Sequence, residues 1–233
     1  MQSNSCRIIT YLSDVQSNLT EWLVFRQTCL DELLRHDGLG DFIGRTGCAS
    51  CSEAAASYKC LDCLSGSLLR CKHCLVTSHQ DNPLHRIEVN AISHSCPVSQ
   101  IHYSPQCWNG NFFVATSLKD LGLRVQLGHG GQPCVSPSEG PKKFSVLDTS
   151  GIHYVAIDFC DCRTNGLVPR RVQLLRAGWF PATFNRPQTV FTFRMLDAYH
   201  ELTLQAKTAL YDYYHTILHY SDNHELGVPV VCN

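Results

Sequence analysis

The sequence predicts an α+β protein in which bound zinc stabilises a small finger module, followed by a β-rich, cysteine-rich domain with flanking helices. Three observations predict this fold class. Cysteines and histidines are dense between residues 48 and 85, short strand-like segments follow from residue 111, and helical periodicity occurs towards both ends. The chain of 233 residues has 44% hydrophobic and 17% charged residues, as expected for a globular protein of one large or two small domains.

The overall charge and hydropathy exclude several classes of protein. The formal net charge is −1 at pH 7, which argues against a strongly electrostatic, non-specific nucleic-acid binder but allows a local basic face. The N-terminal residues contain no apolar run of secretory length, and no apolar segment reaches about 18 residues. We therefore expect an intracellular, reducing location without a membrane partner, where cysteines, fourteen in this chain, serve as metal ligands or remain free rather than form bridges.

A run of apolar residues at steps of three and four predicts a helix over residues 13–36, in an N-terminal helical segment placed at 1–44. Ser13 or Asp14 can cap this helix, and glycines follow its end. Trp22 lies on the apolar stripe, and we interpret it as a packing residue.

The next segment, 45–92, holds the densest group of residues with metal chemistry. It contains three C-x2-C pairs and two histidines, and a tight turn in each pair aims both thiolates at one point. Eight soft ligands suffice for two closed tetrahedral zinc sites, which are structural because no position remains for water or substrate. The ligands are Cys48, Cys51, Cys60, Cys63, Cys71, Cys74, His79 and His85.

These eight ligands can be shared between two ions in two ways, and spacing alone does not choose. In the sequential grouping, the first two C-x2-C pairs bind one ion, and the third pair joins the histidines. In the interleaved grouping, the first pair joins the third, and the second pair joins the histidines. The pattern resembles B-box and related cross-braced fingers, and this resemblance implies the interleaved grouping. Disulfides or buried thiols are the alternative, although repeated C-x2-C is a poor disulfide spacing.

The rest of the chain is organised as a linker and a second domain. Residues 93–107, with prolines and serines, predict a linker or insertion. A β-rich cysteine-cluster domain is expected over 108–223; it ends in a helix over 194–220 and precedes a tail over 224–233. The expected strands cover residues 112–114, 121–127, 144–147 and 154–159.

A second group of possible ligands falls inside this domain. The stretch LGHGGQPC supplies a histidine and a cysteine, and CDC follows a predicted strand. Cys-x-Cys folds back less easily than Cys-x2-Cys, yet both thiols can reach one metal from a bent strand end. We therefore expect two zinc ions in the finger and consider a third here, the alternative being a thiol cluster that packs as small hydrophobes. The four residues are His129, Cys134, Cys160 and Cys162.

Three blocks, WNGNFFVATSLKDLGLRVQLGH, GIHYVAIDFCDC and LLRAGWFPATFNRPQTVFTF, resemble the CxC-like cysteine-cluster domain found beside fungal KDZ (Kyakuja–Dileera–Zisupton) transposases. The resemblance covers roughly 20–223, although the segment 94–107 looks inserted relative to the family. It implies a nuclear, zinc-associated module of a DNA transposon protein. The family's catalytic RNase H-like region is expected far downstream, so the resemblance implies a non-catalytic N-terminal module or a truncated copy.

Enzyme motifs are missing from the sequence. The aspartates lack a spacing that would link them into a two-metal site. His215 and His219 share one helical face, but Thr216 stands where a zincin needs glutamate. The chain has no P-loop, no G-x-S-x-G and no G-x-G-x-x-G. We expect neither catalysis nor a small-molecule substrate.

Between residues 163 and 194 the sequence holds six arginines and neither Asp nor Glu, with aromatic residues interleaved. Arginine suits bidentate phosphate contacts, and aromatic rings stack on splayed bases. The segment therefore predicts one DNA-contacting face; the alternative is that these arginines only pair and pack. A rival function is protein docking or self-association of B-box type without direct DNA binding. The candidate nucleic-acid-binding residues are Arg163, Arg170, Arg171, Arg176 and Arg186.

Overall fold

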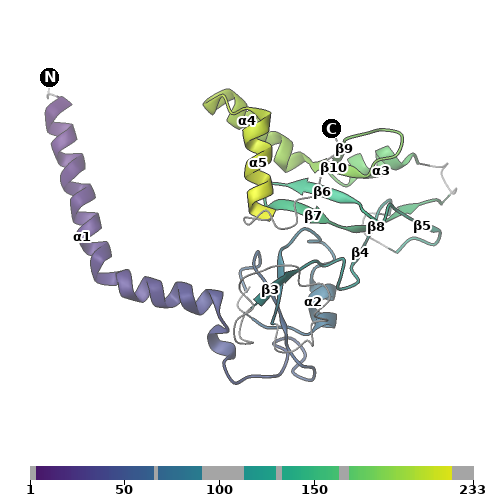
Figure 1. Ribbon diagram of the computed structural model, residues 1–233, viewed down its shortest axis with the longest axis horizontal. Helices are drawn as coiled ribbons and strands as arrows, with labels where there is room; N and C mark the ends of the chain where they lie inside the picture. The colour runs from purple at the N-terminus through teal and green to yellow at the C-terminus, as the bar shows by residue number, and fades with distance from the viewer. Residues whose placement is uncertain (1–3, 66–67, 91–112, 130–132, 163–167, 222–233) are drawn as a thin grey trace. The chain divides into compact units, whose positions relative to one another are not determined.

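The computed structural model describes residues 4–65, 68–90, 113–129, 133–162 and 168–221 (Figure 1). The expected linker at 93–107, the tail at 224–233 and Arg163 lie outside this range. The chain divides into two compact units, Met1–Arg45 and Thr46–Asn233, each of which is described by itself.

The first unit is a long helix, α1 (Asn4–Asp37), followed by a 3-10 turn, η1 (Gly40–Phe42). The helix begins earlier than the expected residue 13, because the preceding sequence contains no glycine or proline that would interrupt it. It ends where expected, before Gly38. Trp22 does not pack as interpreted from the sequence: 49% of its surface is exposed, since the unit contains only η1 as a neighbour for this helix.

The second unit begins with a three-stranded region, which we define as residues 46–123. Its antiparallel sheet has the order β1-β2-β3 and is accompanied by the short helix α2. Lys59 pairs with Glu88 across the first two strands, and Ile87 pairs with Thr116 across the second and third. The elements are β1 (Tyr58–Cys60), α2 (Lys72–Ser78), β2 (Ile87–Asn90) and β3 (Phe113–Thr116).

The core of the three-stranded region draws on both sides of the segment 91–112. Leu75 of α2 and Ile87 of β2 are buried, and they form one cluster with Leu118, Leu121 and Leu123, which follow β3. The sequence predicted a strand from residue 121, but strand structure begins at Arg124. The three leucines lie in or beside a turn instead, in which the Leu123 amide donates to the Leu118 carbonyl over 2.8 Å.

The remainder of the second unit is a two-sheet region, residues 124–221. One sheet has the order β7-β6-β10-β9 and the other the order β4-β8-β5, with parallel pairs β6·β10 and β4·β8 (Figure 1). The mixture of helices and sheets agrees with the expected α+β class. The strands are β4 (Arg124–Gln126), β5 (Pro137–Glu139), β6 (Ser145–Asp148), β7 (Gly151–Tyr154), β8 (Ala156–Cys160), β9 (Trp179–Pro181) and β10 (Thr189–Thr192).

One hydrophobic cluster combines buried side chains of both sheets and of α3 (Arg170–Arg176). Phe144, Ile157, Phe159, Leu174 and Val190 are almost completely buried in it. Alternation of apolar residues along β6, β8 and β10 explains this placement, because successive side chains of a strand point to opposite faces. The predicted strands at 144–147 and 154–159 thus correspond to β6 and to the β7–β8 stretch.

The helix expected over 194–220 is in fact two helices, α4 (Phe193–Ala206) and α5 (Leu210–Ser221). Lys207 takes a left-handed conformation with φ of 53° and ends α4. Neither glycine nor proline marks this break, so the helical periodicity of the sequence does not reveal it. Ser221 then fastens α5 to β7, because its hydroxyl accepts a hydrogen bond of 2.5 Å from the Ile152 amide.

Asp148 is a completely buried carboxylate that joins β6, β10 and the start of α4. It accepts hydrogen bonds of 2.7 Å from the hydroxyls of Thr192 and Ser150, and it forms an ion pair with Arg194. Thr192 also caps α4, since its hydroxyl accepts a bond from the Met195 amide. Burial alone would raise the pKa of Asp148, but these donors, Arg194 foremost, hold the pKa well below its usual range.

None of the helices in the described ranges has the combination of length and apolar character that crossing a membrane would require.

Candidate metal centres

The first C-x2-C pair meets the third at one point of the three-stranded region. Cys48, Cys51, Cys71 and Cys74 bring their sulfur atoms within 4.8 Å of one another, and the Cys51 and Cys71 sulfurs are 4.0 Å apart. Local structure explains the aim of both pairs. A turn that carries Ser52 at a φ of 62° follows the first pair. The Cys71 sulfur caps α2, because it accepts a hydrogen bond from the Cys74 amide.

Backbone N–H groups prepare one sulfur of this group for the thiolate form. The Cys71 amide lies 3.2 Å from the Cys48 sulfur, and the Ser50 amide 3.4 Å from it. Burial alone would raise the pKa of Cys48, but these amides and that of Cys51 lower it to about 6. Neighbouring sulfurs, Cys71 first, instead raise the pKa of Cys74 to about 12. A divalent cation would remove this mutual repulsion.

The second C-x2-C pair meets the two histidines. The Cys63 sulfur lies 3.4 Å from Nε2 of His79 and 3.4 Å from Nδ1 of His85, and the Cys60 sulfur lies 3.4 Å from the same His85 nitrogen. All four ligand atoms lie within 4.8 Å of one another. Burial, chiefly, raises the pKa of Cys60 to about 11, so its thiolate needs a nearby cation.

His79 is oriented for metal binding by a partner behind its ring. It is completely buried, and its Nδ1 lies 2.8 Å from the Leu75 carbonyl oxygen. A proton on Nδ1 donates a hydrogen bond to this oxygen. The tautomer that makes this bond leaves Nε2 with a free lone pair facing Cys63, an arrangement typical of histidines that bind metals. Burial, first, lowers the pKa of His79 and so favours the neutral, ligating ring.

The third group lies in the two-sheet region, at the end of β8. Nε2 of His129 lies 3.1 Å from the Cys160 sulfur, and the Cys134 and Cys162 sulfurs are 3.5 Å apart. The contacts of Cys162 with His129, Cys134 and Cys160 lower its pKa to about 7. Burial first, with neighbouring sulfurs adding to it, raises the pKa of Cys134 to about 11. As in the first group, the pKa of one thiol is lowered while the pKa of another is raised.

Distances in all three groups fit a tetrahedral zinc ion. Zn–S bonds of about 2.3 Å and Zn–N bonds of about 2.0 Å give tetrahedron edges of about 3.3–3.8 Å. The shortest separations between ligand atoms run from 3.1 to 4.0 Å, and all ligand atoms of a group lie within 4.8 Å of one another. A disulfide would need sulfurs about 2.0 Å apart, and the cysteines of the three groups are free. Three cysteine–histidine groups can thus hold metal ions, in agreement with the expected two to three zinc ions.

Two residues that the sequence did not single out support the third group. The buried Gln173 of α3 clamps Cys160: its amide oxygen accepts from the Cys160 N–H and its amide nitrogen donates to the Cys160 carbonyl, both over 2.8 Å. Gly128 lets His129 approach, because a Cβ at position 128, where φ is 109°, would lie only 2.5 Å from the Cys160 Cβ. In the sequence, Gln173 stands out only as a polar residue beside the apolar positions of α3.

The structure separates the arginines that the sequence placed on one face. Arg170 and Arg171 begin α3, whereas Arg176 ends it, and about 100° of rotation per residue turns Arg176 away from the other two. Arg186 lies in the β9–β10 connection and lines a cavity to which the other three arginines do not contribute. Arg170 packs over the Phe159 ring at 4.8 Å and donates to the Ser138 hydroxyl. Of the aromatic residues interleaved with these arginines, Trp179 lies in the core with 6% exposure, whereas Phe180 is 41% exposed.

The fold and the three groups define a protein built around cysteine–histidine clusters that can hold metal. Residues 118–225 match the family model described as a CxC2 like cysteine cluster associated with KDZ transposases. The family so described is an accessory cysteine-cluster domain of transposases rather than a catalytic one, and the matched range contains the third group. The expected relation to KDZ-transposase-associated domains is confirmed for this range. No curated protein and no solved structure matches the chain.

Proposed function

We propose that this chain is a non-catalytic, zinc-binding accessory module of a KDZ-transposase-like protein, that it recognises DNA, and that it acts in the nucleus. Its association with transposases supports a role at DNA, because transposition begins with recognition of transposon ends. The cysteine–histidine groups support a structural role for zinc, because each offers four protein ligands and leaves no coordination position for a substrate.

The metal assignment follows the convergence of ligand atoms. One zinc ion takes the first and third C-x2-C pairs, and a second takes the second pair with His79 and His85, which is the interleaved arrangement of a B-box-like finger. A third takes His129, Cys134 and the two cysteines of CDC. Elemental analysis of protein purified without chelators then gives three zinc ions per chain. A count of two would assign the third group to packing, and a count of zero would refute the assignment.

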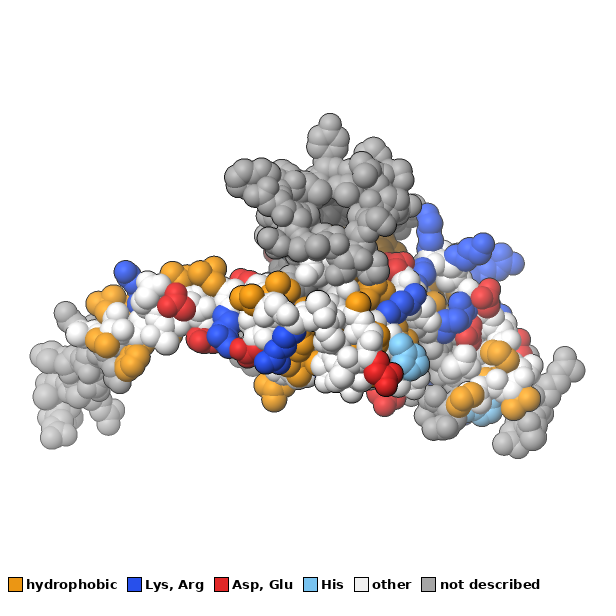
Figure 2. Space-filling view, turned by 90° about the horizontal axis from the view of Figure 1, so that it is seen from below, with side chains coloured by type: hydrophobic (Ala, Val, Ile, Leu, Met, Phe, Trp, Pro, Cys, Tyr) orange, Lys and Arg blue, Asp and Glu red, His pale blue; other side chains and the backbone are white. Residues whose placement is uncertain are grey.

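The observation that carries DNA recognition is the start of α3. Arg170 and Arg171 are both exposed there, and within the described residues neither has a carboxylate within ion-pairing distance, unlike Arg86, Arg124 and Arg194. Guanidinium groups without a carboxylate partner can take up phosphate contacts, Arg170 beside its bond to Ser138. Figure 2 shows lysine and arginine side chains gathered on the two-sheet region.

The test is the salt dependence of binding to duplex DNA, followed by fluorescence anisotropy. The double variant Arg170→Ala/Arg171→Ala loses two phosphate contacts, so its affinity falls and the slope of log affinity against log salt decreases by about 1–2. Lys142→Ala/Lys143→Ala removes the same charge from the turn before β6 and serves as the matched control. Equal behaviour of the two double variants would refute a specific role for α3.

Self-association is the second candidate function, and α1 favours it. Its exposed side chains include Trp22, Phe25, Leu30, Leu33 and Leu34, each at least 46% accessible (Figure 2). An apolar stripe of this length costs stability unless another surface covers it. Sedimentation of the chain against Leu30→Gln/Leu33→Gln distinguishes the functions: a dimer that dissociates in this variant and ignores DNA supports docking in place of DNA recognition.

A further inference from the structure

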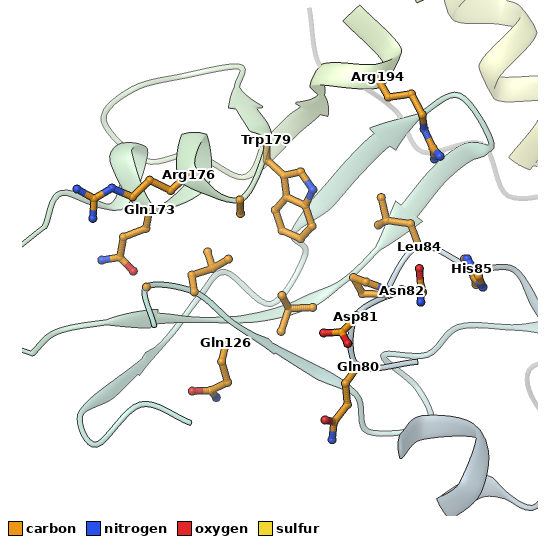
Figure 3. A pocket seen from close by; sticks show the side chains of 15 residues that line it. Gln80, Asp81, Asn82, Leu84, His85, Gln126, Gln173, Arg176, Trp179 and Arg194 are labelled. Carbon is orange, nitrogen blue, oxygen red and sulfur yellow. The ribbon is translucent and has the colours of Figure 1, made fainter. Parts of the chain in front are cut away.

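A cavity of about 640 Å³ lies between the two-sheet region and the loop that connects the ligands His79 and His85. One wall is the loop itself, from Gln80 to His85, and the other includes Gln126, Gln173, Arg176, Trp179 and Arg194 (Figure 3). The size falls within the range of about 300–1,000 Å³ that is usual for small-molecule and cofactor sites. Neither the metal groups nor the arginines at the start of α3 account for this cavity.

Trp179 provides the polar group that points to a ligand. The residue is 94% buried, since 6% is exposed, and its ring packs against Phe144 with centroids 6.1 Å apart. Its indole N–H has no acceptor among the described residues. The indole nitrogen is, however, not fully enclosed by protein atoms. Figure 3 shows the indole projecting into the cavity, with its nitrogen on the side of Leu84 and Arg194. Because this N–H opens on the cavity, it can donate to water or to an acceptor of a bound ligand.

Several of the other polar groups around the cavity already have partners. The Gln173 amide is occupied by Cys160, and the Gln126 amide bonds to Asp158. Arg194 is paired with Asp148 but keeps 68% of its side chain exposed at the rim. The Asp81 carboxylate faces the space below Trp179 from the loop (Figure 3), and it has no cationic partner in the described part of the chain. The cavity thus presents the Trp179 N–H, the Asp81 carboxylate and the side-chain amides of Gln80 and Asn82, with the guanidinium groups of Arg176 and Arg194 at its edge.

We propose that this cavity binds a single unpaired nucleotide of DNA, with its base inside and its phosphate at the rim. The indole N–H of Trp179 donates to a ring nitrogen or carbonyl oxygen of the base, and Asp81 accepts from an exocyclic amino group next to it. Arg176 or Arg194 contacts the phosphate. Adenine, cytosine and guanine carry such an amino group and thymine does not, so the cavity discriminates against thymine. The inference deepens the proposed function, because it rests on DNA being the partner.

Geometry favours a nucleotide over a free anion. The carboxylate of Asp81, an exposed residue beside the cavity, repels phosphate, while it attracts the amino edge of a base. The guanidinium groups, in contrast, lie at the edge, where the backbone of a strand can pass. Arg176 ends the helix that Arg170 and Arg171 begin but lies on another face of it, so the cavity mouth and the start of α3 are separate contact points for DNA.

The test follows the indole N–H signal of Trp179 by nitrogen–proton NMR in the zinc-loaded, full chain. Trp179→Phe identifies the signal by its loss. Titration with deoxycytidine monophosphate or deoxyadenosine monophosphate shifts it saturably, with an affinity roughly five- to tenfold higher than for thymidine monophosphate. Inorganic phosphate leaves it unchanged. Asp81→Asn reduces the preference over thymidine monophosphate to about twofold or less, whereas Asp197→Asn, an exposed carboxylate of α4, preserves it.

Other outcomes separate the two proposals. A signal that no mononucleotide shifts, in protein whose DNA binding still depends on Arg170 and Arg171, overturns the cavity assignment and leaves the proposed function standing. A signal that inorganic phosphate shifts equally also overturns it, because the site then selects only charge. If the mononucleotides shift the signal with the expected preference but duplex DNA does not bind, the cavity assignment holds and recognition of DNA through α3 is wrong.

Discussion

The three-stranded region and the two-sheet region use cysteine and histidine ligands in different ways. In the three-stranded region, two ligand groups serve short strands and a helix of seven residues, and the ligand Cys60 is itself part of the hydrophobic cluster. In the two-sheet region, one group lies at the end of β8, outside a cluster that includes Phe144, Phe159 and Leu174. Small regions that cannot bury enough apolar surface commonly depend on metals. Bound metal would therefore supplement a small core in the first region and fix only a strand end in the second.

The largest effect is expected from removing a buried ligand of the three-stranded region. His79→Ala should abolish one zinc site and unfold residues 57–90, because structural zinc supplies about 10–16 kcal/mol, comparable to the entire stability of a domain, about 5–15 kcal/mol. Zinc content and amide hydrogen exchange measure both effects. His73→Ala, on an exposed residue of the same helix, should retain the full zinc content. A folded His79→Ala region would remove the contrast between the regions.

The next effect is expected inside the two-sheet region, from a residue that binds no metal. Gln173→Leu keeps the volume of the side chain but leaves the Cys160 N–H and carbonyl without partners. Two unsatisfied buried groups should lower the free energy of unfolding by about 3 kcal/mol. Urea denaturation compared with Gln188→Leu, an exposed glutamine, checks this value. Equal stability of the two variants would show that the bound metal, rather than α3, holds the CDC turn.

A smaller effect, dependent on pH, is expected from Asp148. Its pKa is lowered in the folded protein, so the carboxylate contributes stability above the unfolded pKa of about 4, and this contribution is lost as the pH falls towards the folded value. At pH 7, Asp148→Asn should be less stable by about 2 kcal/mol. The difference between the two proteins should shrink below about pH 4. A difference that is constant with pH would indicate a packing role for Asp148.

The smallest effect on the fold is expected from Cys162→Ser. This change should remove the third zinc ion, because one thiolate ligand is lost, yet the hydrophobic cluster of the two-sheet region should remain intact. Zinc content then falls by one ion per chain while hydrogen exchange of β6, β8 and β10 stays slow. Ser136→Ala, near the same strand end, should change neither quantity. Unfolding of both sheets in Cys162→Ser would show that the two regions depend on metal equally.

Sequence reasoning reached the ligands more readily than their arrangement. The C-x2-C spacing identified the residues of the first two groups, because a tight turn fixes both thiols locally. Which pairs meet depends on the pairing of β1 with β2, a contact between residues far apart in the sequence, and spacing carries no information on it. The role of Gln173 could not be predicted for the same reason, since its partner Cys160 lies on another element. The positive φ of Lys207 was equally hidden, because any side chain can pay this modest conformational cost when packing requires it.

The pairing of Asn90 with Phe113 has a consequence for how the chain can be altered. These residues lie opposite each other in β2 and β3, so the segment between them, 91–112, starts and ends at one place on the sheet. Lengthening such a connection costs only the entropy of closing a larger loop, about 0.6 kcal/mol for each doubling of its length. Natural insertions, or a whole added domain, can therefore enter the chain at this point while both strands remain paired.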